Sequence, residues 1–112
     1  MLTPALTEEV YYILITLHEA MNIHGVMQNV ELLSNGRIHL ESGMLNEILN
    51  SLLDKGWILA ESGGNDGRKK KYKITTTGRQ QLKVEVIRLK ELWENGRQIL
   101  EEDVLSESSK TE

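Results

Sequence analysis

Residues 68–79 contain six of the chain's 13 lysines and arginines and no acidic residue. The other seven bases share the rest of the sequence with all 17 acids, so that part carries a net charge of about −10, whereas the whole chain carries −4. A basic patch on an acidic body is typical of proteins that bind nucleic acid, and a solvated hairpin tip is the simpler alternative. Arg79 is either a phosphate contact or a solvated cation. The bases expected to neutralise phosphates are Arg68, Lys69, Lys70, Lys71 and Lys73.

Residues 42–58, SGMLNEILNSLLDKGWI, carry a second set of side chains suited to DNA. Asn46 and Asn50 are four residues apart, so they lie on one side of a helix. An asparagine amide can both donate to and accept from adenine, which typically gives about 1–3 kcal/mol of discrimination between bases. Two ordinary surface asparagines are the alternative. Because Glu47 is acidic, affinity should come mostly from the basic segment. The residues expected to face DNA here are Ser42, Met44, Asn46, Glu47 and Asn50.

Residue types needed for catalysis or metal binding are scattered. The chain has no cysteine, so it can form neither a disulfide nor a thiolate metal site. His18, His24 and His39 share no ligand spacing with a carboxylate. The glycines between residues 63 and 67 match neither phosphate-loop pattern, and no serine or histidine has a recognisable nucleophile context. We therefore expect no enzyme activity, no metal and no cofactor.

Apolar spacing predicts that the asparagine-bearing segment is a helix. Its apolar residues fall at i, i+3, i+4, i+7 and i+8, which places them on one helical face. Ser42 is expected to cap the first turn with its hydroxyl, and Gly56 is expected to end the helix. The apolar positions are Leu45, Ile48, Leu49, Leu52 and Leu53.

Two helices are expected before this one. The first covers about residues 7–20, with its apolar residues four or three apart from Val10 onward. The second has Val26, Val30 and Leu33 on its inner face and ends at the Ser-Asn-Gly sequence that follows. Residues 37–40 alternate between polar and apolar side chains, which predicts a short strand.

A hairpin is expected after the asparagine-bearing helix. Residues 57–60 and 71–74 read as its two strands, and the Asp-Gly step within residues 63–67 is typical of a hairpin turn. Alternation in the second strand points Tyr72 and Ile74 inward and the neighbouring lysines outward.

The last helix is expected to run from about residue 75 to Leu100. Leu82, Val86, Leu89 and Trp93 step by four, three and four along it, which is a heptad-like stripe. Such a wide stripe predicts that a second copy of the chain covers it. Packing is the favoured role of Trp93; the alternative is that Leu89 and Trp93 form a platform for a planar apolar effector.

The order of elements predicts an α+β fold that is mainly α. Three helices followed by a hairpin with a basic tip match a winged helix-turn-helix, in which the third helix enters the major groove. We expect residues 1–75 to form this DNA-binding domain and residues 76–100 to form a C-terminal dimerisation helix. Residues 101–112 are acidic and serine-rich, and we interpret them as a disordered tail.

The chain also resembles the PadR-like transcriptional regulators, within them the short group with a single C-terminal helix. This resemblance implies a homodimeric winged-helix repressor that binds a roughly palindromic operator. The family's third helix usually opens Gly-Thr-Leu-Tyr, whereas here it opens Gly-Met-Leu-Asn, with Met44 and Asn46 in place of the two polar groups. The matching stretches are Leu6-Thr7-Glu8, Val10-Tyr11-Tyr12-Ile13-Leu14, Val26-Met27-Gln28, Ser34-Asn35-Gly36-Arg37, Leu52-Leu53-Asp54-Lys55-Gly56-Trp57-Ile58, Arg68-Lys69-Lys70-Lys71-Tyr72, Ile74-Thr75, Gly78 and Arg88-Leu89-Lys90-Glu91-Leu92.

Bulk composition fits this interpretation. A chain of 112 residues is one domain with a modest core, and no apolar run is long enough to cross a membrane. The N-terminus has acids where a signal peptide has bases, so we expect a cytoplasmic protein. Two alternatives stay open: a winged-helix dimer that binds protein instead of DNA, and a dimer whose main role is to sense a small molecule.

Overall fold

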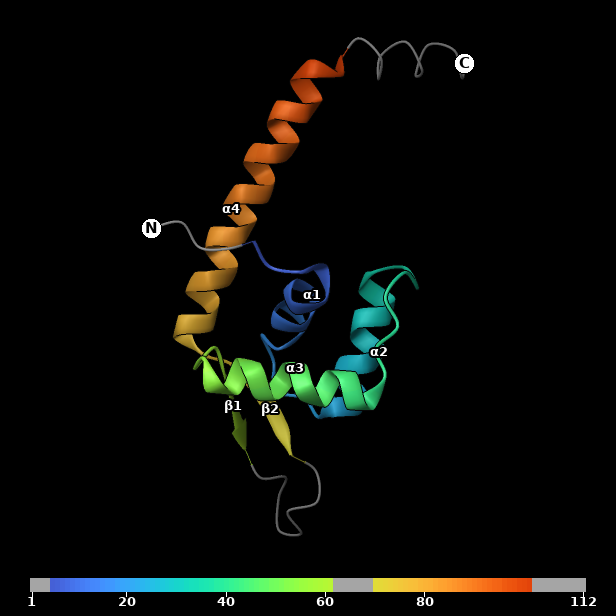
Figure 1. The fold of residues 1–112 in the computed structure, drawn as a ribbon, viewed down its shortest axis with the longest axis vertical. Coiled ribbons are helices and arrows are strands. Elements are labelled where there is room, and N and C mark those ends of the chain that lie inside the picture. The colour runs from blue at the N-terminus through green and yellow to red at the C-terminus, as the bar shows by residue number, and fades with distance from the viewer. Residues whose placement is uncertain (1–4, 62–69, 102–112) are drawn as a thin grey trace. The chain divides into compact units, whose positions relative to one another are not determined.

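The computed structural model describes residues 5–61 and 70–101. It is mainly helical with one small antiparallel sheet, which confirms the expected fold class (Figure 1). The chain divides into two compact units, Met1–Leu82 and Lys83–Glu112, and the boundary falls within the last helix. The elements are α1 (Glu8–Thr16), α2 (Ile23–Leu33), α3 (Ser42–Asp54), β1 (Ile58–Glu61), β2 (Lys71–Ile74) and α4 (Thr76–Ile99).

The core of the first unit is built from the apolar faces of α1, α2 and α3. On α3, Leu45, Leu49 and Leu52 are buried, which confirms the predicted face of this helix. On α2 the prediction was right for Val26 and Val30 and wrong for Leu33, whose residue is 48% exposed. Leu33 is the last residue of α2 and adjoins Leu32, which is also exposed, on the outer side of the helix.

The first helix is shorter than predicted because the chain turns after Thr16. Leu17 is its C-cap, and Met21 pairs with Tyr72 of β2 through both of their backbone groups, with N–O distances of 3.0 and 2.9 Å. Asn22 then caps α2 by accepting from the amide of Gly25 at 2.9 Å. The segment between α1 and α2 is therefore hydrogen-bonded to β2.

The predicted strand at residues 37–40 was wrong: this part of the described chain contains no strand. Ile38 and Leu40 are both buried, so the alternation there reflects burial and not strand pairing. The amide of Ile38 donates to the hydroxyl of Ser34 at 3.0 Å, which satisfies a donor that a strand partner would have taken.

The hairpin strands pair in the register expected for one inward and one outward face. Ile58 lies opposite Ile74, and Ala60 lies opposite Tyr72. Tyr72 and Ile74 are buried while the intervening lysine is exposed, which confirms the predicted facing of β2. The predicted turn at residues 63–67 lies outside the described residues.

Candidate nucleic-acid interface

One side of α3 faces solvent along its whole length. All five residues predicted to face DNA on this helix are exposed. Glu47 lies at the centre of the side opposite the buried leucines, with Met44, Asn46 and Asn50 on its flanks. Ser42 is on the leucine side and is exposed because it lies in the first turn. Met44 presents a thioether, and Asn46 and Asn50 present amides that can donate and accept. The exposed side of α3 thus carries side chains with hydrogen-bonding groups, and the major groove of DNA is wide enough to admit such a helix. The residues are Ser42, Met44, Asn46, Glu47 and Asn50.

The predicted capping role of Ser42 was wrong. Glu41 is the N-cap of α3, and its side chain makes no capping hydrogen bond. The amide of Leu45 donates to the carbonyl oxygen of Glu41 at 2.9 Å, so the helical hydrogen bonds begin one residue earlier than predicted. Ser42 is therefore the first residue within the helix, and its side chain is exposed.

The basic segment is described from Lys70 onward. Lys70, Lys71 and Lys73 are exposed, whereas Arg68 and Lys69 lie outside the described residues. Lys71 and Lys73 share the outward face of β2 because side chains alternate along a strand. Their ammonium groups can therefore reach the same surface from adjacent positions.

A tight turn joins α3 to the hairpin and orients one against the other. Gly56 has a φ of 74°, a left-handed conformation that glycine adopts at little cost and that ends helices. The amide of Trp57 donates to the carbonyl oxygen of Leu52 at 3.0 Å, within the last turn of α3. In Figure 1, α3 runs from α2 to the two strands, and the strands extend away from α1. The exposed side of α3 and the lysines of β2 therefore belong to one packed unit.

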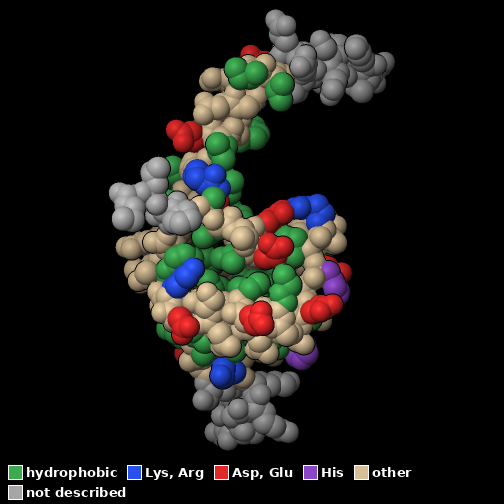
Figure 2. Space-filling view, in the orientation of Figure 1, with side chains coloured by type: hydrophobic (Ala, Val, Ile, Leu, Met, Phe, Trp, Pro, Cys, Tyr) green, Lys and Arg blue, Asp and Glu red, His purple; other side chains and the backbone are tan. Residues whose placement is uncertain are grey.

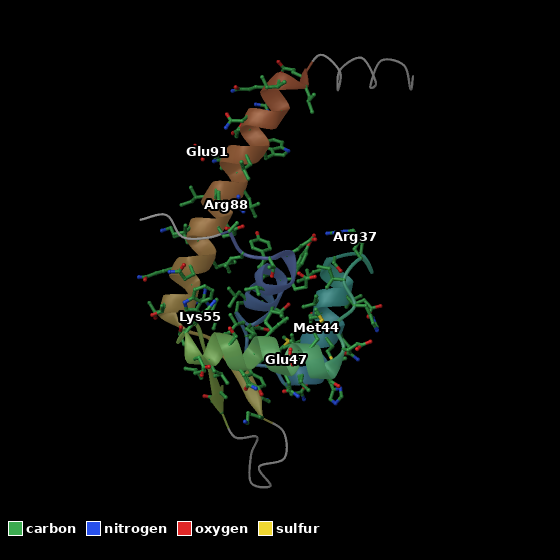
Figure 3. The ribbon with its side chains drawn as sticks, in the orientation of Figure 1. Arg37, Met44, Glu47, Lys55, Arg88 and Glu91 are labelled. Atoms are coloured by element: carbon green, nitrogen blue, oxygen red, sulfur yellow. The ribbon has the colours of Figure 1, made fainter. Side chains whose placement is uncertain are left out.

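An ion pair joins α1 to the loop that leads into α3. The guanidinium of Arg37, labelled in Figure 3, lies 2.5 Å from the carboxylate of Glu8 and also donates to the hydroxyl of Tyr12 at 3.4 Å. The hydrogen bond from Arg37 holds the pKa of Glu8 below its usual value, and the same contact raises the pKa of Arg37. Sequence reasoning missed this pair because the residues are far apart in the chain.

A cavity that the sequence did not reveal lies between the start of α1 and the end of α3. Its volume is about 310 Å³, and its apolar lining includes Leu6, Val10 and Ile48. Lys55 also lines it, with its ammonium nitrogen 4.8 Å from the centre of the Trp57 ring. Figure 2 shows apolar side chains exposed together on this face of the first unit. The cavity can accommodate a small apolar group next to a positive charge.

A family model supplies the decisive comparison. The model of the transcriptional regulator PadR-like family matches residues 10–84, which run from within α1 through β2 to the start of α4. The chain belongs to the PadR-like family of transcriptional regulators. No match was found among curated proteins.

Solved structures share the fold of this PadR-like chain at low sequence identity. A transcriptional regulator from Clostridium thermocellum, Cth-833, is 16% identical, with 84% of this chain and 89% of that chain covered and a TM-score of 0.62. BpsR of Bordetella bronchiseptica, whose DNA binding is regulated by 6-hydroxynicotinic acid, is 14% identical, with coverages of 97% and 83% and a TM-score of 0.66. A PadR family regulator from Clostridium difficile is 15% identical, with coverages of 87% and 97% and a TM-score of 0.57.

The second unit of this PadR-like regulator presents apolar side chains to solvent. Leu89 is 36% exposed and Trp93 is 63% exposed, so both residues of the predicted effector platform are accessible. The Arg97 guanidinium lies 5.4 Å from the centre of the Trp93 ring, where a cation–π contact covers part of it. Leu82, the first residue of the predicted stripe, belongs to the first unit and packs against its core.

Neither a metal-binding cluster nor a membrane-spanning helix is present among the described residues of this regulator. They contain no group of three or more histidine, cysteine, aspartate or glutamate residues that could hold a metal ion. None of their helices is long and apolar enough to cross a membrane.

Proposed function

We propose that this regulator binds double-stranded DNA as a homodimer and represses transcription by occupying a promoter. In this proposal α3 lies in the major groove, and the basic segment around β2 contacts phosphates. The α4 helices of two copies pair and set the separation of two half-sites, so the operator is roughly palindromic. Because promoter DNA lies in the cytoplasm, we propose that this regulator acts there.

The observation that carries the proposal is the shared unit of α3 and the hairpin. The exposed side of α3 is connected to β1 through a single turn at Gly56, and Lys71 and Lys73 are exposed on the paired strand. Lysines neutralise phosphates and release counterions, which supplies affinity irrespective of sequence. Exposed amides at Asn46 and Asn50 supply contacts to base edges.

The proposal of a homodimer rests on α4. Exposed apolar side chains recur along its second-unit part at spacings of three and four residues, and a soluble monomer rarely leaves so many together. A second copy offers the same apolar face, as isologous dimers require. The exposed large apolar residues there are Val84, Val86, Ile87, Leu89, Leu92, Trp93, Ile99 and Leu100.

A mobility-shift assay on the DNA upstream of the protein's own gene tests the function. At low salt we expect a retarded complex, and sedimentation of the free protein should give the mass of a dimer. A dimer that shifts no duplex would favour the alternative of a winged-helix module that binds protein. A monomer would contradict the proposed arrangement of half-sites.

Small-molecule sensing is a second candidate function, and two observations favour it. Trp93 is exposed beside Leu89, and the cavity at Lys55 and Trp57 has an apolar lining. The neighbour BpsR is regulated by 6-hydroxynicotinic acid. We infer that a planar apolar effector binds at Leu89 and Trp93 between two copies and alters the spacing of the two α3 helices.

The chain has two tryptophans, which makes the location of an effector measurable. Trp57→Phe leaves only Trp93 as a fluorophore, and Trp93→Phe leaves only Trp57. A planar aromatic probe should quench the Trp57→Phe protein and leave the Trp93→Phe protein unchanged. The reverse pattern would place the effector at the cavity, and no quenching of either variant would remove the sensing candidate.

A further inference from the structure

Glu47 lies at the centre of the solvent-facing side of α3. The residues four before and three after it, Gly43 and Asn50, are also exposed, and the buried leucines occupy the opposite side. Figure 3 shows Glu47 between the two ends of α3. Its carboxylate forms no hydrogen bond or ion pair with any residue that the structure describes. Within the described ranges, no residue neutralises this charge.

α3 has no basic residue to offset this charge. Glu47 and Asp54 are its only ionisable residues, so the helix carries a negative charge into any approach to DNA. Phosphates repel it, and a carboxylate in the groove is favourable only when a donor on a base edge faces it. An acidic side chain at this position therefore permits tight binding only where a base with a suitable donor faces it.

The major groove offers few donors. Guanine presents two acceptors, and thymine presents one acceptor and a methyl group. Adenine places an acceptor beside its amino group, whereas cytosine presents its N4 amino group alone. Cytosine is thus the base whose edge best suits a carboxylate.

We propose that Glu47 is a specificity-determining residue that reads cytosine in the operator by accepting from its N4 amino group. This inference rests on the proposed function, because it requires α3 to lie in the major groove. The lysines of β2 supply affinity for any sequence, and Glu47 lowers affinity for every site that has guanine or thymine at its position.

Selection from a pool of randomised duplexes tests the inference with wild type, Glu47→Gln, Glu47→Ala and Asp54→Asn. All of these substitutions remove one negative charge from an exposed position of α3. Asp54→Asn is the matched control, because it removes the same charge from the last residue of α3, away from the centre of the exposed side. Circular dichroism of each variant checks that the fold is retained.

We expect wild type and Asp54→Asn to enrich a C·G pair at one position of each half-site by about tenfold or more over guanine or thymine. Both Glu47 variants should lose that preference and bind random duplexes more tightly at low salt. Unchanged base preferences in both Glu47 variants would overturn the inference, as would equal loss in Asp54→Asn. If wild type binds no duplex, the proposed DNA binding fails first, and this inference fails with it.

Discussion

A Cβ atom on residue 78 would lie 2.1 Å from the carbonyl oxygen of Trp57, so Gly78 is the point where α4 meets the start of the hairpin. The same carbonyl accepts from the amide of Thr75 at 2.9 Å. The Thr75 hydroxyl donates to the carbonyl oxygen of Gly56 at 2.6 Å and accepts from the amide of Gly78 at 3.0 Å. The first turn of α4 is therefore joined to the turn that follows α3.

Gly78→Ala should destabilise the protein by about 1–3 kcal/mol, because the added methyl group overlaps backbone atoms that other hydrogen bonds hold in place. Urea unfolding followed by circular dichroism measures the change. Gly43→Ala is the matched control, since nothing lies within 4 Å of a Cβ there. Alanine at that helical position should leave stability unchanged or raise it by up to about 1 kcal/mol. Equal effects of the two substitutions would contradict the close approach.

The parts of the fold that follow from local periodicity could be predicted from the sequence. Leu45, Leu49 and Leu52 recur at helical spacing, and Tyr72 and Ile74 alternate along a strand, so their burial follows from geometry alone. The exposure of Glu47 on the opposite side of α3 follows in the same way. These patterns determine which side of an element faces the core.

Features that depend on distant partners could not be predicted. Residues 37–40 alternate like a strand but do not pair in the sheet, whereas Met21 pairs with Tyr72 without any local signal for it. The cavity at Lys55 combines residues from the chain's start with the end of α3. The pairing of Glu8 with Arg37 likewise has no local signal.

Replacing Lys71 with alanine should weaken binding to every duplex by a similar factor. Lys71 is exposed on β2, and a phosphate contact carries no sequence information. If about four to six phosphates are neutralised per dimer, the plot of log K against log salt concentration has a slope near −4 to −5. Losing two contacts per dimer should reduce that slope by about 2. Fluorescence anisotropy at several salt concentrations measures it, with Lys90→Ala on α4 as the control. Sequence-selective loss would argue that Lys71 contacts bases.

The ion pair of Glu8 with Arg37 should make stability depend on acidic pH. Because the folded-state pKa of Glu8 is lowered, its contribution is present above the ordinary pKa of 4.5 and is lost as pH falls through the lower folded value. The difference in Tm between wild type and Glu8→Gln should therefore shrink below about pH 4.5. A cycle with Arg37→Gln isolates the coupling of the two side chains. A Tm difference that stays constant from pH 7 to pH 3 would show that another contact of Glu8 is responsible.

Leu89→Glu should separate the proposed dimer into monomers. Leu89 and Trp93 are four residues apart and therefore lie on the same side of α4. If two copies pair through this side, a carboxylate at position 89 would be buried without a partner. We expect the dimer dissociation constant to rise at least about a hundredfold, and sedimentation velocity measures it. Glu91→Lys is the control, because Glu91, labelled in Figure 3, is two residues from Leu89 and faces another side of the helix. If Leu89→Glu stays dimeric while Glu91→Lys dissociates, a different side of α4 forms the contact.

A monomeric Leu89→Glu protein should also bind DNA differently from wild type. Its affinity should fall more for an operator with two half-sites than for a single half-site, because only a dimer binds both halves together.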